Sequence, residues 1–414
     1  MNFWGWGFYT IAISLYLACV RIAALFNKKA AQMVRGHKET FKILREKMEP
    51  GCEYIWFHAA SLGEFEQGRP LMERIRRDYP QYKILLTFFS PSGYEVRKNY
   101  EGADVICYLP LDTPINAARF VKVVHPVMAF FIKYEFWQNY FKVLEHKHIP
   151  IYSVSSIFRP EQVFFRWYGG QYYKVLTRVT HFFVQNEQSK ALLETRGVKG
   201  NVTIVGDTRF DRVNEIAALA KQLPLVEAFK QNASVFVAGS SWEPDEDLFI
   251  PYFNNHKDWK LIIAPHVVSE SHIKTIVDKL DRKVVRYTQA TLENVKDAEC
   301  LIIDCYGLLS SIYRYGDISY VGGGFGVGIH NLLEAAIYGI PVLFGPNNQR
   351  FQEAQELKAC GGGVEIKDAV TLKETLDKFL MNEVALKQAG SAAGTYVSSK
   401  IGASDKVLAV VFKK

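Results

Sequence analysis

A short segment of this chain carries a carboxylate where a substrate hydroxyl group could be deprotonated. Residues 58–65 read HAASLGEF and lead from an apolar run into a helical pattern. Glu64 falls in the first turn of the expected helix, and a base there contributes about 10²–10⁴ in rate. The helix dipole lowers the pKa of such a carboxylate, so a base needs burial to offset it. The alternative is an ordinary glutamate that stabilises the start of its helix.

A glycine-rich segment follows a second apolar run. Residues 321–335 read VGGGFGVGIHNLLEA and predict a strand, a loop and a helix. The spacing matches neither the dinucleotide G-x-G-x-x-G pattern nor a P-loop, which needs G-K-S/T. Backbone N–H groups in such a loop and at a helix N-terminus suit a phosphate. Glu334 could accept hydrogen bonds from ribose hydroxyl groups, and a bare glycine turn is the alternative.

Two further segments, residues 304–309 and residues 263–266, also lie at expected strand ends. Ligands of open α/β sheets bind beyond the carboxyl ends of the strands, which is where both would lie. Each segment alone is weak evidence for a site, because a single histidine such as His266 is more often structural than a ligand.

The elements that position these segments alternate between strands and helices. The first half contains apolar runs at residues 54–58, 84–89, 105–109, 127–132, 151–154 and 181–184. A second set lies at residues 235–238, 261–264, 301–303, 318–321 and 341–344. Such alternation predicts parallel sheets covered by helices on both faces. We therefore expect two Rossmann-like domains facing a cleft, at residues 28–215 and 216–385, with a helical segment 386–414 that could pack back on the first domain.

The N-terminal residues 1–27 are expected to attach the protein to a membrane. Residues 3–20 carry no charge, and about 18 apolar residues is near the minimum for a spanning helix. The basic residues that follow favour an anionic membrane surface and a cytoplasmic location for the domains; they are Arg21, Lys28, Lys29, Arg35, Lys38, Lys42, Arg45 and Lys47. The alternatives are a segment that lies in one leaflet and, for the basic residues, a solvated helix face.

Composition excludes several other classes of protein. The net charge of +7 over 414 residues comes without a dense basic stripe, so no nucleic-acid partner is expected. The 6 cysteines form no C-x-x-C pair, which argues against a zinc site or a disulfide framework and favours a reducing compartment.

Taken in order, several segments resemble the bacterial 3-deoxy-D-manno-octulosonic acid (Kdo) transferase family of lipopolysaccharide synthesis. The resemblance extends from the N-terminal segment to about residue 400, and the ordered set is specific although no single member is. The matching segments are residues 58–64, 136–139 (FWQN), 185–187 (QNE), 206–211 (GDTRFD), 264–266 (APH), 306–308 (YGL) and 322–334.

The resemblance implies a GT-B architecture and an inverting, metal-independent transfer of Kdo from CMP-Kdo to a lipid A precursor, without a cofactor, at the cytoplasmic face of the inner membrane. It implies that Glu64 is the proton acceptor and that Arg209 stabilises the transition state. The residues implied to bind the CMP-sugar are Pro265, His266, Tyr306, Gly307, Leu308, Asn331, Leu332, Leu333 and Glu334. On the acceptor side it implies Ser61, Gly63 and Glu135.

The sequence departs from the family pattern at three places. The family usually has E-x-E-L-W-P, whereas residues 133–138 here read KYEFWQ, so Lys133 replaces an acid that has a transition-state role. Trp242 stands where the family often has histidine, and Arg209 where lysine is more usual. No catalytic role is carried over to Lys133.

Two alternative functions remain open from the sequence. One is another GT-B glycosyltransferase, or an epimerase, that uses a UDP- or GDP-sugar. The other is a non-catalytic, membrane-attached sugar-nucleotide binder, which the replacement at Lys133 favours. The oligomeric state is not indicated.

Overall fold

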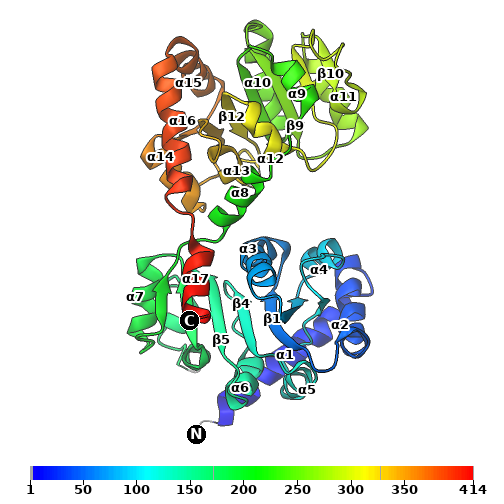
Figure 1. Cartoon of the computed structure of the whole chain (residues 1–414), viewed down its shortest axis with the longest axis vertical. Coiled ribbons are helices and arrows are strands. Elements are labelled where there is room, and N and C mark those ends of the chain that lie inside the picture. The colour runs from blue at the N-terminus through cyan, green and yellow to red at the C-terminus, as the bar shows by residue number, and fades with distance from the viewer. Residues whose placement is uncertain (1–2, 171, 327, 414) are drawn as a thin grey trace. The chain divides into compact units, whose positions relative to one another are not determined.

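The computed structural model describes residues 3–170, 172–326 and 328–413, and the chain forms two compact units (Figure 1). Unit 1 is Met1–Arg212 with Gly402–Lys414, and unit 2 is Val213–Ile401. Each unit is an α/β domain built on a seven-stranded parallel sheet, as the alternating pattern predicted. The predicted C-terminal segment is divided: α16 (Glu383–Ser398) lies in unit 2, and α17 (Ala403–Val411) lies in unit 1.

In unit 1 the chain moves to one edge of the sheet and then returns past its starting strand. The strand order is β3 (Val105–Tyr108), β2 (Tyr82–Phe88), β1 (Glu53–Ala59), β4 (Met128–Ile132), β5 (Ile151–Ser156), β6 (His181–Val184) and β7 (Val202–Ile204). The order reverses between β1 and β4, which is where an open parallel sheet forms a ligand crevice. Segment 58–65 begins at the end of β1, and segment 133–138 directly follows β4.

Helices cover both faces of this sheet, so its strands are apolar on both sides. Along β1, Trp56 packs with Phe131 on one face, and Phe57 packs with Phe130 on the other. The helices of unit 1 after the N-terminal pair are α3 (Leu62–Asp78), α4 (Pro91–Arg97), α5 (Pro114–Val124), α6 (Gln138–His146), α7 (Glu187–Thr195) and α17, while α8 (Arg209–Ala218) leads into unit 2.

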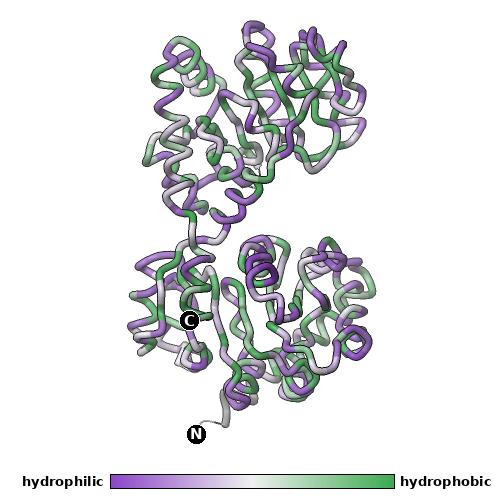
Figure 2. The backbone as a smooth tube through the Cα atoms, viewed as in Figure 1, coloured by the Kyte–Doolittle hydropathy of each residue, from purple (hydrophilic) through white to green (hydrophobic). Residues whose placement is uncertain are grey.

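The sheet of unit 2 also has one reversal in its strand order. Its strand order is β10 (Val284–Arg286), β11 (Cys300–Ile302), β9 (Lys260–Pro265), β8 (Val235–Ser241), β12 (Ile318–Val321), β13 (Val342–Phe344) and β14 (Gly363–Glu365), with the reversal between β8 and β12. Its helices are α9 (Pro224–Lys230), α10 (Glu243–Asn255), α11 (Glu270–Lys279), α12 (Leu309–Ile312), α13 (Leu333–Ala336), α14 (Gln352–Cys360), α15 (Ala369–Met381) and α16. Figure 2 shows hydrophobic residues along the strands of each unit.

Two helices precede the first strand. Helix α1 (Phe3–Ala23) is tied to unit 1 by Tyr9, whose Oη donates to Oδ2 of the buried Asp112 over 2.7 Å, and α2 (Lys28–Lys47) follows. Helix α1 exposes Ile11 and Leu15, which are 60% and 61% accessible. In the described part of the chain no helix combines the length and apolarity needed to cross a membrane. The spanning form of the predicted anchor is therefore not supported.

Candidate active site

The carboxylate of Glu64 lies at the reversal point of the unit 1 sheet. Strand β1 ends at Ala59, Ser61 is the N-cap residue of α3, and Glu64 occupies the first turn. Its Oε2 accepts hydrogen bonds from the backbone N–H groups of Ala60 (2.6 Å) and Ser61 (3.2 Å). Glu64 therefore stabilises the start of its helix by accepting from these N–H groups, which is the alternative role expected from the sequence. To act as a base, its carboxylate must also be able to accept a proton.

Burial first, and then the negative charge of Glu135, raise the pKa of Glu64, and the net result of all contributions is a pKa of about 7. The N–H donors of Ala60 and Ser61 and the charge of Lys133 oppose this shift. Burial therefore outweighs the helix-terminus effects that lower a carboxylate pKa. A group with a pKa near 7 can accept and release a proton at neutral pH, which is the property of a general base.

A line of hydrogen bonds fixes the second carboxylate, Glu135. Its Oε2 accepts from Trp137 Nε1 (2.9 Å) and lies 3.3 Å from His58 Nε2. His58 Nδ1 lies 2.9 Å from Thr87 Oγ1, which in turn accepts from Trp56 Nε1 over 2.8 Å. Thr87 Oγ1 donates to the Phe57 oxygen over 3.2 Å, and its lone pairs can accept from both Trp56 Nε1 and His58 Nδ1. His58 thus contacts Thr87 through one ring nitrogen and Glu135 through the other.

The loop that carries Arg209 is held by the same helix that carries Glu64. Gln67, one turn after Glu64 on α3, donates from Nε2 to Asp207 Oδ1 (3.0 Å), and its backbone oxygen accepts from Thr208 Oγ1 (2.6 Å). Asp207 Oδ2 accepts from Arg209 Nε over 2.8 Å. Helix α3 therefore sets the position of both predicted catalytic residues.

The hydroxyl group of Tyr134 is within the electrostatic range of several of these groups. Burial is the main cause that raises its pKa, and the charges of Arg159, Glu64, Asp207 and Arg209 all act on it. Glu64 and Arg209 are 145 positions apart in the sequence, and in unit 1 the charges of both act on this one hydroxyl group.

Residues at three strand ends near the reversal points have a left-handed backbone. These are Lys133 (φ 60°) after β4, Ser155 (φ 54°) in β5 and Ser240 (φ 52°) in β8. Non-glycine residues rarely take this conformation, and it clusters at functional sites. Ser155 Oγ lies 2.8 Å from Thr208 Oγ1, so one of these left-handed residues forms a hydrogen bond with the residue that precedes Arg209.

The acceptor-side prediction at Ser61 and Gly63 falls beside Glu64. Ser61 is half-buried and Gly63 is exposed. A Cβ atom at Gly63 would meet no heavy atom within 4 Å, so packing within the described residues does not require glycine there. Gly63, the neighbour of Glu64 in the sequence, therefore borders open space.

In unit 2, three aromatic rings stack where the sheet order reverses. His266 follows β9, Trp242 follows β8, and His330 belongs to the loop after β12. The ring centroids are 4.6 Å apart for Trp242–His266 and 4.3 Å apart for His266–His330.

Trp242 also determines where His330 carries its proton. Trp242 Nε1 donates to His330 Nε2 over 3.1 Å. Because the indole only donates, the neutral His330 must carry its proton on Nδ1. Burial, and then the charge of His266, lower the pKa of His330. A neutral His330 with an Nδ1–H donor is the result.

The glycine-rich loop differs from the expected phosphate cradle. The N–H of Gly323 donates to Asp245 Oδ2 (3.0 Å), and those of Gly326 and Gly328 donate to the Gly323 oxygen. These three N–H groups therefore do not face a ligand in this conformation. The glycines serve close backbone packing instead, since a Cβ at Gly324 would lie 2.5 Å from the Gly345 Cα.

The helix expected to begin near His330 is also corrected by the structure. Helix α13 begins at Leu333 and has 4 residues, which gives it little dipole. Asn331 precedes the N-cap residue Leu332; its side chain accepts from Leu333 N (3.2 Å) and donates to Glu334 Oε1 (3.0 Å). Leu332 and Leu333 are fully buried, so a ligand cannot contact them in this conformation.

The remaining predicted nucleotide-binding residues gather on the neighbouring strand ends. Pro265 is buried at the end of β9, and Tyr306 is 72% exposed after β11. Tyr306 Oη accepts from Val268 N over 3.1 Å, which joins the two loops. Gly307 has φ 89°, and Leu308 follows it at the start of α12.

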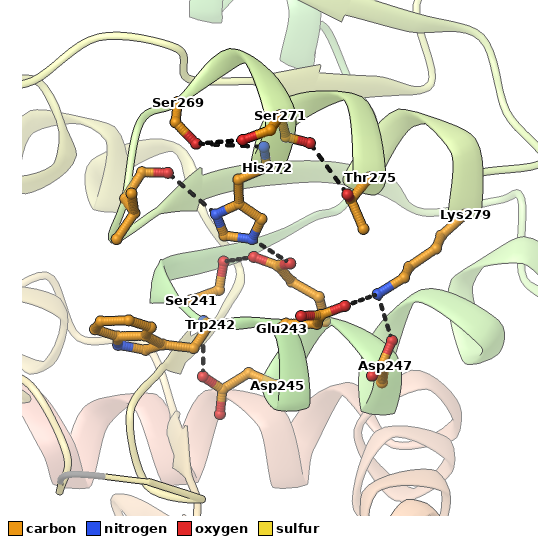
Figure 3. A network of polar contacts seen from close by, with 12 residues as sticks. Ser241, Trp242, Glu243, Asp245, Asp247, Ser269, Ser271, His272, Thr275 and Lys279 are labelled. Carbon is orange, nitrogen blue, oxygen red and sulfur yellow. Dashed lines mark hydrogen bonds and ion pairs between the residues drawn. The ribbon is translucent and has the colours of Figure 1, made fainter.

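An acid–histidine pair, Glu246 and His272, supports the loops of this site; Figure 3 labels His272 and the neighbouring Ser241. Glu246, which is fully buried, accepts from Ser241 Oγ (2.8 Å) and lies 2.8 Å from His272 Nε2. His272 Nδ1 lies 3.1 Å from the Val267 oxygen. The pair thus connects the residues next to Trp242 with the residue next to His266.

The sequence reasoning missed these supporting residues. Thr87 is the direct register partner of His58 on neighbouring strands, and each is a polar residue inside an apolar run. Polar residues in otherwise buried strands were the available signal for the His58–Thr87 contact. Gln67, Asp207 and the Glu246–His272 pair left no comparable signal, because their partners are set by tertiary packing.

Comparison with known proteins gives a consistent result. A family model described as 3-Deoxy-D-manno-octulosonic-acid transferase (kdotransferase) matches residues 35–212. The 3-deoxy-D-manno-octulosonic acid transferase of Aquifex aeolicus is 28% identical over 344 residues, 80% of this chain and 88% of that protein. The Haemophilus influenzae protein of the same name is 24% identical over 97% of this chain and 96% of its own length.

Solved structures with a similar fold have distant sequences. UDP-GlcNAc 2-epimerase from Neisseria meningitidis, solved bound to UDP-GlcNAc, aligns with a TM-score of 0.61 at 14% identity, over 87% of this chain and all of that one. MurG from Acinetobacter baumannii aligns with a TM-score of 0.55 at 10% identity, over 87% of this chain and 100% of the other. At this identity the likeness concerns the fold alone.

Replacing Glu64 by glutamine should change how stability depends on pH. The pKa of Glu64 is about 7 in the folded protein and near 4.5 when unperturbed. The folded state therefore binds this proton more tightly, and wild type loses stability as pH rises from about 4.5 to about 7. Glutamine keeps the capping geometry and does not titrate. The urea midpoint of Glu64→Gln should therefore increase relative to that of wild type as the pH rises across this window. A difference in midpoint that stays constant with pH would contradict the raised pKa.

Trp242→Phe should raise the pKa of His330. Phenylalanine keeps a ring in the stack but removes the N–H that stabilises the neutral imidazole. The measurement is an NMR titration of protein with ¹⁵N-labelled histidine. Trp259→Phe, the same change at a buried tryptophan elsewhere in unit 2, is the matched control. A His330 titration that is identical in wild type and Trp242→Phe would show that the hydrogen bond has no such role.

Proposed function

As a member of the Kdo transferase family this chain is a glycosyltransferase, and we propose that it transfers Kdo from CMP-Kdo to a lipid A precursor of the lipid IVA type. The observation that carries the proposal is Glu64, with its pKa of about 7 beside Glu135 at a sheet reversal point. It lies within residues 35–212, the part that the family model matches.

Glu64 acts as the base in the proposed reaction. A sugar hydroxyl of the acceptor lipid attacks the anomeric carbon of Kdo, and the proton of that hydroxyl passes to Glu64. The new bond joins the acceptor oxygen to this carbon, while the bond from the carbon to the CMP phosphate oxygen breaks. A single displacement of this kind inverts the anomeric centre. The space beside Gly63 supports acceptor binding next to Glu64.

Positive charge, rather than a proton from an acid, stabilises the leaving group. CMP departs with negative charge on its phosphate, and Kdo has a carboxylate of its own, so fixed cations and donors stabilise both. Arg209 is oriented by Asp207 and belongs to the GDTRFD segment. Lys133 sits close enough to act on the charge of Glu64, and it adds a cation where the family pattern has an acid. We propose that the reaction needs no metal and that the protein has no cofactor.

Unit 2 is the proposed CMP-Kdo domain. The rings of Trp242, His266 and His330 give it an aromatic surface, and the Nδ1–H of His330 gives it a donor. Tyr306 and Glu334 are the proposed partners of the base and of the ribose hydroxyl groups. Three N–H groups of the glycine-rich loop already form hydrogen bonds within the protein. We therefore assign the contact with the CMP phosphate to side-chain donors and to other backbone groups of the loop.

We further propose that the protein attaches to the cytoplasmic face of the inner membrane without crossing it. Helix α1 exposes Ile11 and Leu15, and Leu25 and Phe26 just after it are 76% and 88% accessible. The lysines and arginines of α2 follow directly, and basic groups near a membrane surface each add about 1 kcal/mol of attraction. The protein would bind its acceptor lipid at this membrane surface.

The direct test is product formation from tetraacylated lipid A precursor and CMP-Kdo, followed by mass spectrometry of the lipid. Wild type should form the Kdo-lipid in the presence of EDTA, and Glu64→Gln should be slower by about 10²–10⁴-fold while binding CMP normally. Glutamine preserves the helix start, so a folded variant isolates the loss of the base.

Three outcomes would count against parts of this assignment. Product from both proteins at equal rates would remove Glu64 from its role. Loss of product in EDTA would overturn metal independence. No product from folded wild type, together with competition by UDP rather than CMP, would move the protein to another class of sugar-nucleotide enzyme.

A further inference from the structure

A cavity of about 550 Å³ lies between α5 and α6 in unit 1. Its apolar floor includes Val121, Val143 and Ile149, of which Val121 and Ile149 are buried. This volume is within the range of small-ligand sites. The cavity belongs neither to the loops around Glu64 nor to any segment that the family resemblance assigned to CMP, although Asn139 is shared with the FWQN segment.

The charged residues of the cavity wall are all basic or histidine. They are Lys122, His125, Lys142, His146 and Lys147, and no aspartate or glutamate lines the cavity. The nearby Glu145 is engaged by Arg178 at 2.9 Å. Basic residues in a last helical turn also stabilise the helix dipole, but that effect requires no apolar cavity beside them. A ligand of complementary character combines an apolar part with an anionic group.

Asn139 forms the closed end of the cavity wall. It is 1% accessible, and its Nδ2 donates to the Asp112 backbone oxygen over 2.6 Å. This contact fixes the start of α6 against a residue that precedes α5, so the wall between the two helices is held in place.

The cavity is joined to the helix that presents apolar side chains to solvent. Asp112 accepts from the N–H of Asn139 (3.0 Å) and also from the Tyr9 hydroxyl of α1. Helices α1, α5 and α6 lie at one end of unit 1 (Figure 1). If α1 lies on a bilayer, one shared carboxylate connects it with the wall of the cavity.

We propose that the α5–α6 cavity binds one anionic glycerophospholipid of the bilayer. The phosphate pairs with the lysines of the wall, and the upper part of one acyl chain covers the valine and isoleucine floor. The remaining chain length stays in the bilayer. The inference builds on the proposed membrane attachment and is independent of the transfer chemistry.

The test is native mass spectrometry of the full chain in detergent with phosphatidylglycerol or phosphatidylcholine added. Wild type should retain one phosphatidylglycerol per chain in preference to phosphatidylcholine. Ala118→Trp fills the cavity and keeps every charge, and it should weaken this binding at least tenfold. Lys122→Ala with Lys147→Ala should abolish the preference for the anionic lipid.

The matched control is Lys274→Ala with Lys378→Ala, which removes the same charge from exposed positions in unit 2 and should leave binding unchanged. Unaltered thermal midpoints establish that the variants are folded. Binding by Ala118→Trp equal to wild type would overturn the proposal, as would equal losses in the control. Displacement of phosphatidylglycerol by an equimolar lipid A precursor would assign the cavity to the acceptor instead. Because the readout is lipid retention, its failure is separate from failure of the transferase assignment.

Discussion

The ionisation of Glu64 is set by opposing interactions, and much of unit 1 is arranged around them. Two backbone N–H groups and the charge of Lys133 favour the carboxylate, whereas burial and Glu135 favour the acid, and the second pair prevails. Neither side alone would give a useful base. The N–H donors alone would keep its pKa low, and burial without donors would leave the helix start unsatisfied.

The strands and helix around this carboxylate keep the balance fixed. Glu135 has its orientation from His58 and Trp137, and His58 is held through Thr87 on the neighbouring strand. Helix α3 carries Glu64 and, one turn later, the Gln67 that holds the Arg209 loop. A change in any of these contacts would alter either the proton affinity of Glu64 or the place of the cation that accompanies it.

Much of the fold was predictable because its signals are local. Apolar runs separated by helical patterns specify parallel sheets, and the motifs lie at the carboxyl ends of strands in both units. The positions of Glu64 at a helix start and of His266 after β9 followed from the pattern alone. The roles of Arg209 and Glu135 came only from the family resemblance, since nothing local indicates that either residue lies near Glu64.

The features that escaped prediction depend on tertiary contacts. Five glycines suggested free N–H donors, but Asp245 and the Gly323 oxygen bind three of them. The helix after this loop is a single turn, and Gly339 and Pro341, both poor helix formers, follow it. The uncharged N-terminal run suggested a membrane anchor that spans the bilayer or lies in one leaflet, yet no helix among the described residues is long and apolar enough to span. The hydrophobic periodicity of a sequence predicts which face of a helix or strand is buried. It does not predict which polar atoms form hydrogen bonds with one another.

The pH dependence of transfer in wild type and Glu135→Gln tests the central claim most directly. Glutamine can accept the hydrogen bond from Trp137 and can keep the contact with His58, but it lacks the charge that raises the pKa of Glu64. The rate in wild type should rise with pH through a midpoint at about 7, because Glu64 must lose its proton to act as a base. In Glu135→Gln the midpoint should move to lower pH. An unchanged midpoint in a folded, active variant would contradict the coupling of the two carboxylates on which this account rests.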